Sequence, residues 1–503
     1  MKNRLRPQLP LLITLLCGAV HAQNFNRPVP VGFPAYEFEQ LSSGYSGYFL
    51  TTTSMLNGKT GNRDMAILDA DGYLAWFASD NTVRSGFEYH PEFQRFVYYQ
   101  SGPQGVRFIE MDTSLNPVDT LAAPTGITFD GHEYTLTSNH HKIVFGVKDT
   151  VMDLSAYTFN GQQGLANENV IANTLYEFDE NNQLLFSWTS TDHIHPTEFI
   201  DGFNYNPNAF DYLHFNAIEM DDDGNFLLSG RHTSTIYKVN RTTGAIMWRW
   251  GGSMSDFTLT SGTPFSGQHH IRKLGNGRYS MFNNNNPSGP SHAVEYTLDT
   301  AKMEYAEAWS YTHQPSTYTM AMGSHQHRSD DLHLINWGLI YRPAPSFTLI
   351  DANDQPMVNV YFRDSVAAYR SFAQDLDFTL PRPEISCDRP VGDLVLTAPT
   401  AASYLWSDGS TTQSITVTDT GTYMVWVPYG IGMIGSMPFQ VDDLVGTCPV
   451  NGIEEAQDDR PELIEKLFDL TGREVKTPMP YQLYIGRTGS GKSRMIYGLP
   501  SSR

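Results

Sequence analysis

The chain contains the segment Met65-Ala-Ile-Leu-Asp-Ala-Asp-Gly-Tyr-Leu-Ala-Trp76, in which two short apolar runs flank an acidic turn. Such a pattern is typical of a β-hairpin. A similar unit recurs along the chain, in residues 108–118, 175–188, 236–248, 295–309 and 347–361. A unit that recurs in this way indicates a repeat architecture.

The spacing of these hairpins predicts the fold class. They begin roughly 45 to 65 residues apart, which is close to the period of four-stranded propeller blades. Two further strands should precede each outer hairpin, as residues 215–220 and 225–230 do. We therefore predict an all-β protein in which residues 35–378 form a six-bladed β-propeller. A β-sandwich array or a solenoid is the alternative, but a sandwich does not require one unit to recur in this way.

Histidines stand at or just before the starts of the predicted innermost strands. His132 precedes residues 133–136, and His214 precedes residues 215–220. The pattern continues with His269 and His270 before residues 271–274, and with His325 and His327 before residues 332–336. Because the innermost strands of a propeller line its channel in the same direction, we expect these residues to gather at one mouth of the channel.

Arg231 is expected at the same mouth. It follows residues 225–230, which should pair with the strand that His214 begins, and a hairpin brings such ends together. Side chains alternate along a strand, so His269 and His270 should not both face the channel. For the same reason His232 should point away from it if Arg231 points inward.

Imidazole and guanidinium groups together suit the transfer of a sulfuryl or phosphoryl group. A neutral imidazole is a nucleophile and an acid–base group near pH 7. Arginine holds tetrahedral oxyanions through a planar fork of donors. These residue types do not distinguish sulfur from phosphorus. Strand-end surface histidines are one alternative, and a zinc or copper site is another, although the adjacent Arg231 would repel a cation.

Several ordered motifs resemble the arylsulfotransferase family, namely His132-Glu-Tyr134, His214-Phe-Asn-Ala-Ile218, Ser229-Gly-Arg-His232, Trp248-Arg-Trp-Gly-Gly252, Gln268-His269 and Asn336-Trp-Gly338. The resemblance covers residues 35–378. It implies an aryl-sulfate sulfotransferase that is PAPS-independent, since it needs no nucleotide sulfate donor. Such an enzyme moves a sulfuryl group from a phenolic sulfate ester to a phenolic acceptor by ping-pong transfer through a sulfohistidine.

The resemblance also implies catalytic roles. His269 matches the nucleophile, with His270 beside it as the alternative. The supporting residues match His132, His214 and Arg231. No cofactor and no metal is implied. The implied partners are a small-molecule phenolic sulfate donor and a phenol acceptor.

Two other functions fit part of this pattern. A non-enzymatic extracellular propeller would bind glycans or proteins, and a metal-dependent hydrolase or lyase would use the same histidines. The additional residues His325 and His327 are candidates for further catalytic residues of the same site.

Residues 1–22 have the features of a signal peptide. Lys2, Arg4 and Arg6 precede a short apolar stretch, and small residues end at Ala22. No later stretch is apolar enough to span a membrane, so we predict no membrane insertion. The net charge of −21 argues against nucleic acid or an anionic membrane as a partner.

The C-terminal part has a different pattern. Short alternating strands in residues 385–448 resemble an immunoglobulin-like (Ig-like) β-sandwich, and we predict a disulfide between Cys387 and Cys448. Residues 463–503 resemble a sorting domain of type IX secretion. This resemblance implies a secreted or cell-surface protein, exported through the periplasm and outer membrane, with the type IX secretion machinery as a partner.

The segment Gly486-Arg-Thr-Gly-Ser-Gly-Lys-Ser493 matches the phosphate-binding loop of nucleotide-binding proteins. That loop needs a following helix whose N-terminus meets the phosphates. Only ten residues follow Ser493, and they include Gly498 and Pro500. We therefore predict that this segment is a turn in a β-hairpin.

Overall fold

The computed structural model describes residues 23–55, 64–79, 82–102, 105–287, 289–340, 343–363, 365–445, 447–448, 464–470, 472–476, 483–488 and 493–497. In these residues the protein is all-β, as predicted. The helical elements among them are three short 3₁₀ helices, η1 (Ser190–Asp192), η2 (Pro196–Glu198) and η3 (Pro390–Gly392). The predicted signal peptide, residues 1–22, lies outside the described residues.

The described chain divides into two compact units. Unit 1 takes in Met1–Ser386, Thr397–Ile415 and Thr420–Val441, and unit 2 takes in Cys387–Leu396, Thr416–Asp419 and Asp442–Arg503. All of the sites described below belong to unit 1.

Six sheets of four or more strands account for most of unit 1 in the described residues, and they are named sheets 1 to 6 in chain order. Written from the innermost strand outward, sheet 1 is β29 (Val366–Gln374), β3 (Tyr48–Met55), β4 (Met65–Leu68), β5 (Leu74–Ala78), β36 (Gly432–Gly435), β35 (Val425–Tyr429) and β32 (Leu405–Trp406). Sheet 2 is β6 (Val83–His90), β7 (Arg95–Gly102), β8 (Gly105–Met111) and β9 (Pro117–Ala122). Sheet 3 is β10 (Thr128–Leu136), β11 (Lys142–Met152), β14 (Glu168–Phe178) and β15 (Leu184–Thr189).

The other three sheets follow in the same order. Sheet 4 is β16 (Phe215–Met220), β17 (Phe226–Gly230), β18 (Thr235–Val239) and β19 (Ile246–Gly251). Sheet 5 is β21 (His269–Gly275), β22 (Arg278–Asn283), β23 (His292–Asp299), β24 (Glu304–Tyr311) and β20 (Thr258–Ser261). Sheet 6 is β25 (Ser324–His327), β26 (His333–Asn336), β27 (Phe347–Ile350), β28 (Pro356–Phe362), β2 (Tyr36–Gln40) and β1 (Gln23–Asn26).

The predicted hairpins are confirmed. Each is an antiparallel pair in its own sheet, formed by β4–β5, β8–β9, β14–β15, β18–β19, β23–β24 and β27–β28. An acidic turn joins β4 to β5, where the Asp69 carboxylate accepts hydrogen bonds from the amides of Asp71 and Tyr73. Such turns fix the register of each outer hairpin locally, which explains why the sequence pattern identifies them.

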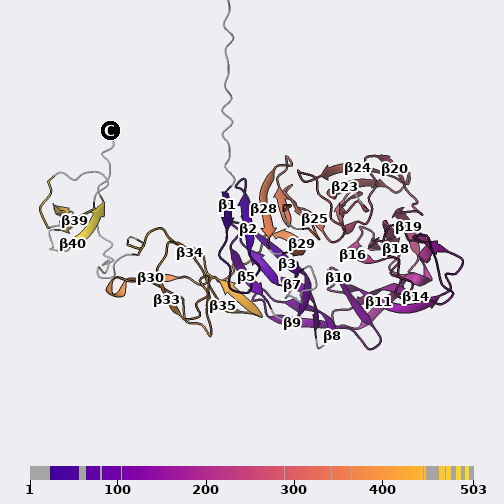
Figure 1. Cartoon of the computed structure of the whole chain (residues 1–503), viewed down its shortest axis with the longest axis horizontal. Coiled ribbons are helices and arrows are strands. Elements are labelled where there is room, and N and C mark those ends of the chain that lie inside the picture. Colours follow the sequence, from indigo (N-terminus) through magenta and orange to yellow (C-terminus); the bar gives the residue numbers. More distant parts are fainter. Residues whose placement is uncertain are drawn as a thin grey trace, which may run out of the picture. The chain divides into compact units, whose positions relative to one another are not determined.

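The innermost strands contact one another in a closed series. Each of β29, β6, β10, β16, β21 and β25 contacts the next, and β25 contacts β29 again. The chain closes this series at both of its ends. The N-terminal strand β2 pairs with β28 of sheet 6, while the late strand β29 pairs with β3 of sheet 1 (Figure 1).

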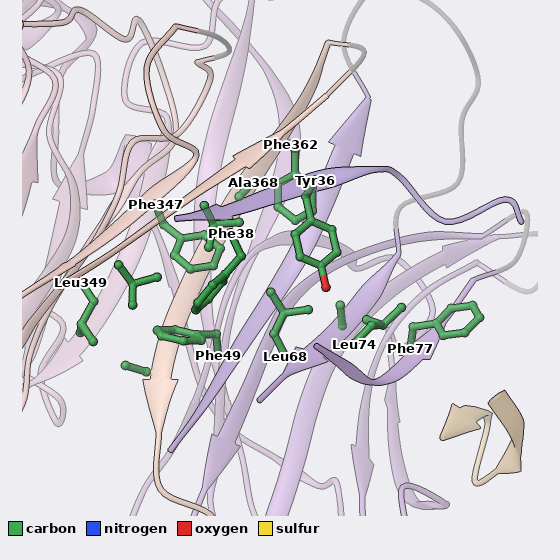
Figure 2. Packing of buried hydrophobic residues seen from close by; sticks show 14 of the residues in the cluster. Tyr36, Phe38, Phe49, Leu68, Leu74, Phe77, Phe347, Leu349, Phe362 and Ala368 are labelled. Carbon is green, nitrogen blue, oxygen red and sulfur yellow. The ribbon is translucent and has the colours of Figure 1, made fainter. Parts of the chain in front are cut away.

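Buried apolar side chains fill the space between sheets 6 and 1. Figure 2 shows Phe38 of β2 next to Phe49 of sheet 1 and Phe347 of sheet 6. All three are fully buried, and the rings of Phe38 and Phe49 meet edge to face with centroids 6.1 Å apart. The junction of the first and last sheets therefore depends on a strand from the N-terminal end of the described chain.

The remaining strands are β12 (Thr158–Phe159), β13 (Gln162–Gln163), β30 (Ser386–Asp388), β31 (Leu394–Thr397), β33 (Ser414–Val417), β34 (Gly421–Tyr423), β37 (Phe439–Val441), β38 (Ile464–Phe468), β39 (Leu483–Thr488) and β40 (Ser493–Tyr497). Within the range predicted to be Ig-like, residues 385–448, strands β32, β35 and β36 extend sheet 1 through β5. The predicted disulfide between Cys387 and Cys448 is present in unit 2.

The phosphate-loop segment joins two antiparallel strands. Arg487 of β39 pairs with Ser493 of β40, and the residues between, 489–492, lie outside the described residues. The prediction of a β-hairpin is confirmed for the strands that flank the turn.

Candidate active site

His214 directly precedes β16, and Arg231 directly follows β17. Phe215 of β16 pairs with Gly230 of β17, and the Arg231 N–H donates a hydrogen bond to the His214 carbonyl at 3.2 Å. The prediction that this hairpin brings His214 and Arg231 together is confirmed.

His232 lies beside the same two residues. Its ring stacks on the His214 ring with centroids 4.8 Å apart, and its Nε2 lies 2.6 Å from Arg231 Nη1. Since His232 Nδ1 donates to the Asp211 carbonyl at 2.6 Å, Nε2 is left to accept from the guanidinium. The prediction that His232 points away is wrong, because β17 ends at Gly230 and the alternation of side chains ends there.

Two aspartates hold two of the histidines through Nδ1. Asp211 Oδ2 lies 2.5 Å from His214 Nδ1, and Asp130 Oδ1 contacts His132 Nδ1. The rings of His132 and His214 meet edge to face with centroids 4.9 Å apart. Neither carboxylate was predicted from the sequence, although an Asp two or three residues before a His is a usable signal.

His132 lies within its strand rather than before it, which corrects the predicted boundary. Strand β10 begins at Thr128, and its pairing register shifts between Phe129 and Tyr134. Residues between these two positions leave the regular ladder, as in a β-bulge. The irregularity directs the His132 ring toward His214 of the neighbouring sheet.

His269, the first residue of β21, is almost completely buried. Its Nδ1 lies 2.6 Å from Asn284 Oδ1, and its Nε2 accepts a hydrogen bond from the Met322 N–H at 3.2 Å. Because an amide oxygen only accepts, Nδ1 carries the proton and the lone pair is on Nε2.

The histidines differ in charge. Burial and the nearby Arg231 cation lower the pKa of His269 well below its usual value, so this ring is neutral near pH 7. His214 and His132 act in the same direction, which places these groups within electrostatic range of His269. Burial works to lower the pKa of His132 as well, but the Asp130 carboxylate outweighs it and the pKa is raised.

Residues 319–322, named here segment 319–322, connect Arg231 to His269. The Met320 carbonyl accepts a hydrogen bond from Arg231 Nη2 at 2.6 Å. Asn284 Nδ2 donates to the carbonyls of Thr319 and Met322, each at 3.1 Å. The segment therefore fixes the guanidinium and the Asn284–His269 pair relative to each other.

His270 faces a different direction from His269. Its φ of 60° is left-handed, its Nδ1 donates to the His325 carbonyl at 3.0 Å, and its ring lies 5.8 Å from that of Phe372. His269 and His270 therefore contact different partners. The cause is the left-handed backbone at His270 and the register shift between His269 and Arg272, rather than the regular alternation that was expected.

The structure places His325 and His327 in another cluster. Both belong to β25, the innermost strand of sheet 6, whereas the sequence had assigned that position to residues 332–336. His327 Nδ1 lies 2.7 Å from Glu295 Oε1, and His325 Nε2 lies 2.9 Å from His333 Nδ1. These residues are therefore not among the groups around Arg231.

An ion-paired group occupies the innermost strands near His132. Glu133 of β10 lies 2.9 Å from Arg370 of β29 and 3.1 Å from Arg272 of β21. Arg370 also donates to the Asn216 carbonyl at 2.7 Å. Four sheets are thus connected by charge-assisted hydrogen bonds beside the histidines.

A cavity of about 620 Å³ lies next to Arg231. Its lining includes the side chains of Phe203, Phe265, Tyr318 and Met320. The Arg231 guanidinium lies over the Phe203 ring, 5.0 Å from its centroid. Asp201 also lines the cavity, so its wall carries one cation and one carboxylate beside the apolar side chains. The apolar side chains and Arg231 suit a ligand that has an aromatic ring and an anionic group.

Residues 106–363, just over half of the chain, match the protein family described as arylsulfotransferase (ASST). The chain belongs to the arylsulfotransferase family. Membership supports a sulfotransferase enzyme that acts on small-molecule aryl sulfates and phenols. No curated protein matches the chain.

Solved structures similar to this arylsulfotransferase family member share little sequence with it. A protein of unknown function from Bacteroides caccae is 13% identical, with 65% of this chain and 98% of that chain covered and a TM-score of 0.40. The periplasmic gluconolactonase PpgL of Pseudomonas aeruginosa is 9% identical, with 78% and 99% covered and a TM-score of 0.35. Scores this low carry no argument about fold or function.

The site also offers metal-ligating atoms. Asp211, His214 and His232 each place one such atom within 4.8 Å of the others. However, His232 Nδ1 is bound to the Asp211 carbonyl and Nε2 faces the Arg231 guanidinium, so a cation would meet a positive charge. This arrangement favours an anion at the site. No helix in the described part of the chain is long and apolar enough to cross a membrane.

Proposed function

We propose that this arylsulfotransferase family member is a PAPS-independent aryl-sulfate sulfotransferase. It moves a sulfuryl group from a phenolic sulfate ester to a phenolic acceptor by ping-pong transfer through a sulfohistidine. We further propose that sheets 1 to 6 are the blades of a six-bladed β-propeller, with the site at one end of its channel.

One observation carries the proposal. A neutral histidine, His269, lies within electrostatic range of Arg231 and of two histidines with carboxylate partners, His132 and His214. A nucleophile needs an unprotonated nitrogen, whereas a departing phenolate needs a proton donor. His269 supplies the nitrogen and His132, whose pKa the Asp130 carboxylate raises, supplies the proton, while Arg231 supplies the cation for a sulfate ester.

In the first half-reaction, the lone pair of His269 Nε2 attacks sulfur and the bond from sulfur to the phenolic oxygen breaks. The phenolate takes a proton from His132 and leaves as a phenol. Arg231 and His214 bind the three oxygens of the transferred group. In this structure the Met322 N–H donates a hydrogen bond to Nε2. This bond must break before Nε2 can attack, and the N–H is then free to donate to a sulfuryl oxygen.

In the second half-reaction, the acceptor phenol attacks the sulfur of sulfohistidine. Its proton passes to His132, the bond from sulfur to Nε2 breaks, and His269 is restored as a neutral imidazole. We place the acceptor in the same cavity as the donor, beside Arg231, because a ping-pong order uses one site for both phenols in turn. The largely apolar lining around Phe203 and Tyr318 suits both phenols.

The test uses a chromogenic aryl sulfate with and without a phenol. Release of the donor phenol should depend on the acceptor, and initial rates should give parallel double-reciprocal lines. Donor alone should leave one sulfuryl group on His269, detectable by mass spectrometry of the intact protein and its peptides. A sequential rate pattern without any covalent adduct would reject the ping-pong route.

Two variants locate the chemistry. His269→Ala should lower the transfer rate by at least about 10³-fold, as loss of a nucleophile does. His195→Asn is the control, because His195 is an exposed residue that caps η2 and Asn is also a good capping residue. Activity that survives in His269→Ala but is lost in His270→Ala would move the nucleophile to His270.

We propose the same export route that the sequence motifs imply. Residues 1–22 would act as a signal peptide, residues 385–448 as an Ig-like module, and residues 463–503 as a sorting domain read by the type IX secretion machinery. The protein would then be secreted or held at the cell surface. Fractionation of producing cells, with and without residues 463–503, tests this route.

A further inference from the structure

A second group of metal-ligating side chains lies between sheets 5 and 6. It consists of Glu295 in β23, His327 in β25 and His333 in β26, with His325 of β25 beside them. One ligand atom each from Glu295, His327 and His333 lies within 4.8 Å of the others. The proposed sulfuryl transfer uses none of these residues.

The carboxylate oxygen Glu295 Oε1 is at the centre of the cluster. It lies 2.7 Å from His327 Nδ1, 3.7 Å from His333 Nδ1 and 3.9 Å from His325 Nε2. A tetrahedral ion with metal–ligand bonds of about 2.0–2.1 Å separates its ligand atoms by about 3.3–3.4 Å. The observed separations lie on both sides of this value, so shifts of a few tenths of an ångström to about 1 Å would close the site.

The position of the cluster suits a cation. Glu295 and His325 are fully buried, and His333 is 5% exposed. His325 Nε2 and His333 Nδ1 face each other at 2.9 Å, so one of these nitrogens donates to the other. Both lie within 3.9 Å of Glu295 Oε1, so an ion that displaces the shared proton would meet two nitrogen lone pairs and a carboxylate oxygen.

The surrounding contacts would hold the ligands in place. Asp331 Oδ1 lies 3.5 Å from the other ring nitrogen of His327. Arg278 pairs with the second oxygen of Glu295 and leaves Oε1 to the imidazoles that face it. In the Asp211 cluster, by contrast, Arg231 contacts the His232 ring nitrogen itself. The Trp309 ring stacks on His333 with centroids 4.2 Å apart. Carboxylates and other groups behind metal ligands commonly fix ring orientation in this way.

An entry path leads to the cluster. His327, Arg278 and Asp331 line a second cavity of about 600 Å³. A hydrated ion can reach His327 from this cavity, exchange its water for the buried ligands and displace the proton that His327 shares with Glu295.

We propose that Glu295, His327 and His333, completed by His325, bind a divalent cation of the zinc class. Three imidazoles and one carboxylate are a ligand set that zinc accepts, and four protein ligands are typical of a structural site. The ion would connect β23 of sheet 5 to β25 and β26 of sheet 6. Its role would be to stabilise the junction between these two sheets, independently of the sulfuryl-transfer chemistry.

The test uses the full chain, dialysed against a chelator and then titrated with Zn²⁺. We expect tight binding by calorimetry, with a rise in Tm on the order of a few degrees because the ion binds the folded state. Co²⁺ in place of Zn²⁺ should give the strong visible absorption of a tetrahedral site. Absence of these bands in the unaltered chain would overturn the proposal without any variant.

Three variants assign the ion to residues. His327→Gln and Glu295→Gln should each weaken Zn²⁺ binding by about 100-fold or more and remove the Tm increase. His232→Gln, in the other histidine cluster, is the matched control and should retain both. Binding that survives His327→Gln and disappears in His232→Gln would assign the ion to the Asp211 cluster and reject this site. Metal content and Tm report on this proposal whether or not the chain transfers sulfuryl groups.

Discussion

The partner at Nδ1 distinguishes His269 from His132. Asn284 accepts from His269 as a neutral amide, whereas Asp130 accepts from His132 as a carboxylate. A carboxylate favours the imidazolium, and an amide does not. Replacing an aspartate by an asparagine at Nδ1, or the reverse, should therefore shift the acidic or the alkaline limb of the pH–rate profile.

Asp130→Asn should shift the alkaline limb. With Asp130 present, the pKa of His132 is raised, and the proton donor stays charged to higher pH. Without the carboxylate this pKa falls, so kcat/KM should begin to decline at lower pH than in the unaltered protein. The variant keeps the size of the side chain and an oxygen that accepts from the backbone N–H of His132. An alkaline limb at its original pH would remove His132 from the role of proton donor.

Asn284→Asp should shift the acidic limb in the opposite direction. A carboxylate beside Nδ1 raises the pKa of His269, which burial and Arg231 otherwise hold well below its usual value. A larger fraction of the nucleophile is then protonated in mild acid, so activity should be lost at higher pH than in the unaltered protein. The pH dependence of single-turnover sulfurylation measures this limb directly. If the limb is unchanged, a group other than His269 limits the reaction in acid.

At the level of strands, the sequence predicted what is local. The acidic turn at Asp69 and its equivalents fix hairpins within a few residues, so the pairing of β4 with β5 and the meeting of His214 with Arg231 were visible in the pattern. The sequence did not predict that β29 is the innermost strand of sheet 1, because pairing between residues 48–55 and 366–374 has no local signature.

The same limit applies inside the site. Asp130, Asp211 and Asn284 act through short contacts that depend on turns and on a register shift in β10. A shift of register cannot be read from alternating apolar residues, because it changes which face each side chain meets. His232 was misassigned for the related reason that β17 ends at Gly230, before both Arg231 and His232, so strand alternation does not apply to them.

Gly323 directly follows segment 319–322, and a substitution there tests whether the position of the segment matters. Gly323 has a φ of 104°, and a Cβ there would lie 2.4 Å from the Phe282 ring. Gly323→Ala should therefore displace the segment and misplace both Arg231 and the Met322 N–H. We expect kcat to fall by about 10- to 100-fold, the size of effect that follows small misplacements in a site.

Gly224→Ala is the matched control for this variant. Gly224 also has a positive φ, 76°, but no atom lies within 4 Å of its Cβ position. It lies in the turn between β16 and β17, at the end away from Arg231. Both variants carry the same kind of backbone strain, so a difference between them isolates the displacement of segment 319–322. Equal loss of kcat in the two would attribute the effect to strain alone.

For the whole molecule, closure of the six sheets depends on two long-range pairings. Strand β2 adds to sheet 6 and β29 adds to sheet 1, so neither end can separate without breaking a sheet (Figure 1). The apolar cluster of Figure 2 lies between the same two sheets. Stability of the closed ring should therefore be most sensitive to side chains of β2, although they lie in a different sheet from His269.

Phe38→Ala tests this dependence. Phe38 is fully buried and contacts Phe49 across the junction, so its truncation leaves a cavity between sheets 6 and 1. We expect the free energy of unfolding to fall by about 3–5 kcal/mol, as for other buried phenylalanines, measured by denaturant unfolding of the full chain.

Val31→Ala is the control. Val31 is near Phe38 in the sequence and 73% exposed, so this variant should change the free energy of unfolding by less than about 0.5 kcal/mol. Because Phe38 does not contact the histidines, the folded fraction of Phe38→Ala should keep its kcat. A loss below about 1 kcal/mol would mean that the pairing of β2 with β28 alone closes the ring.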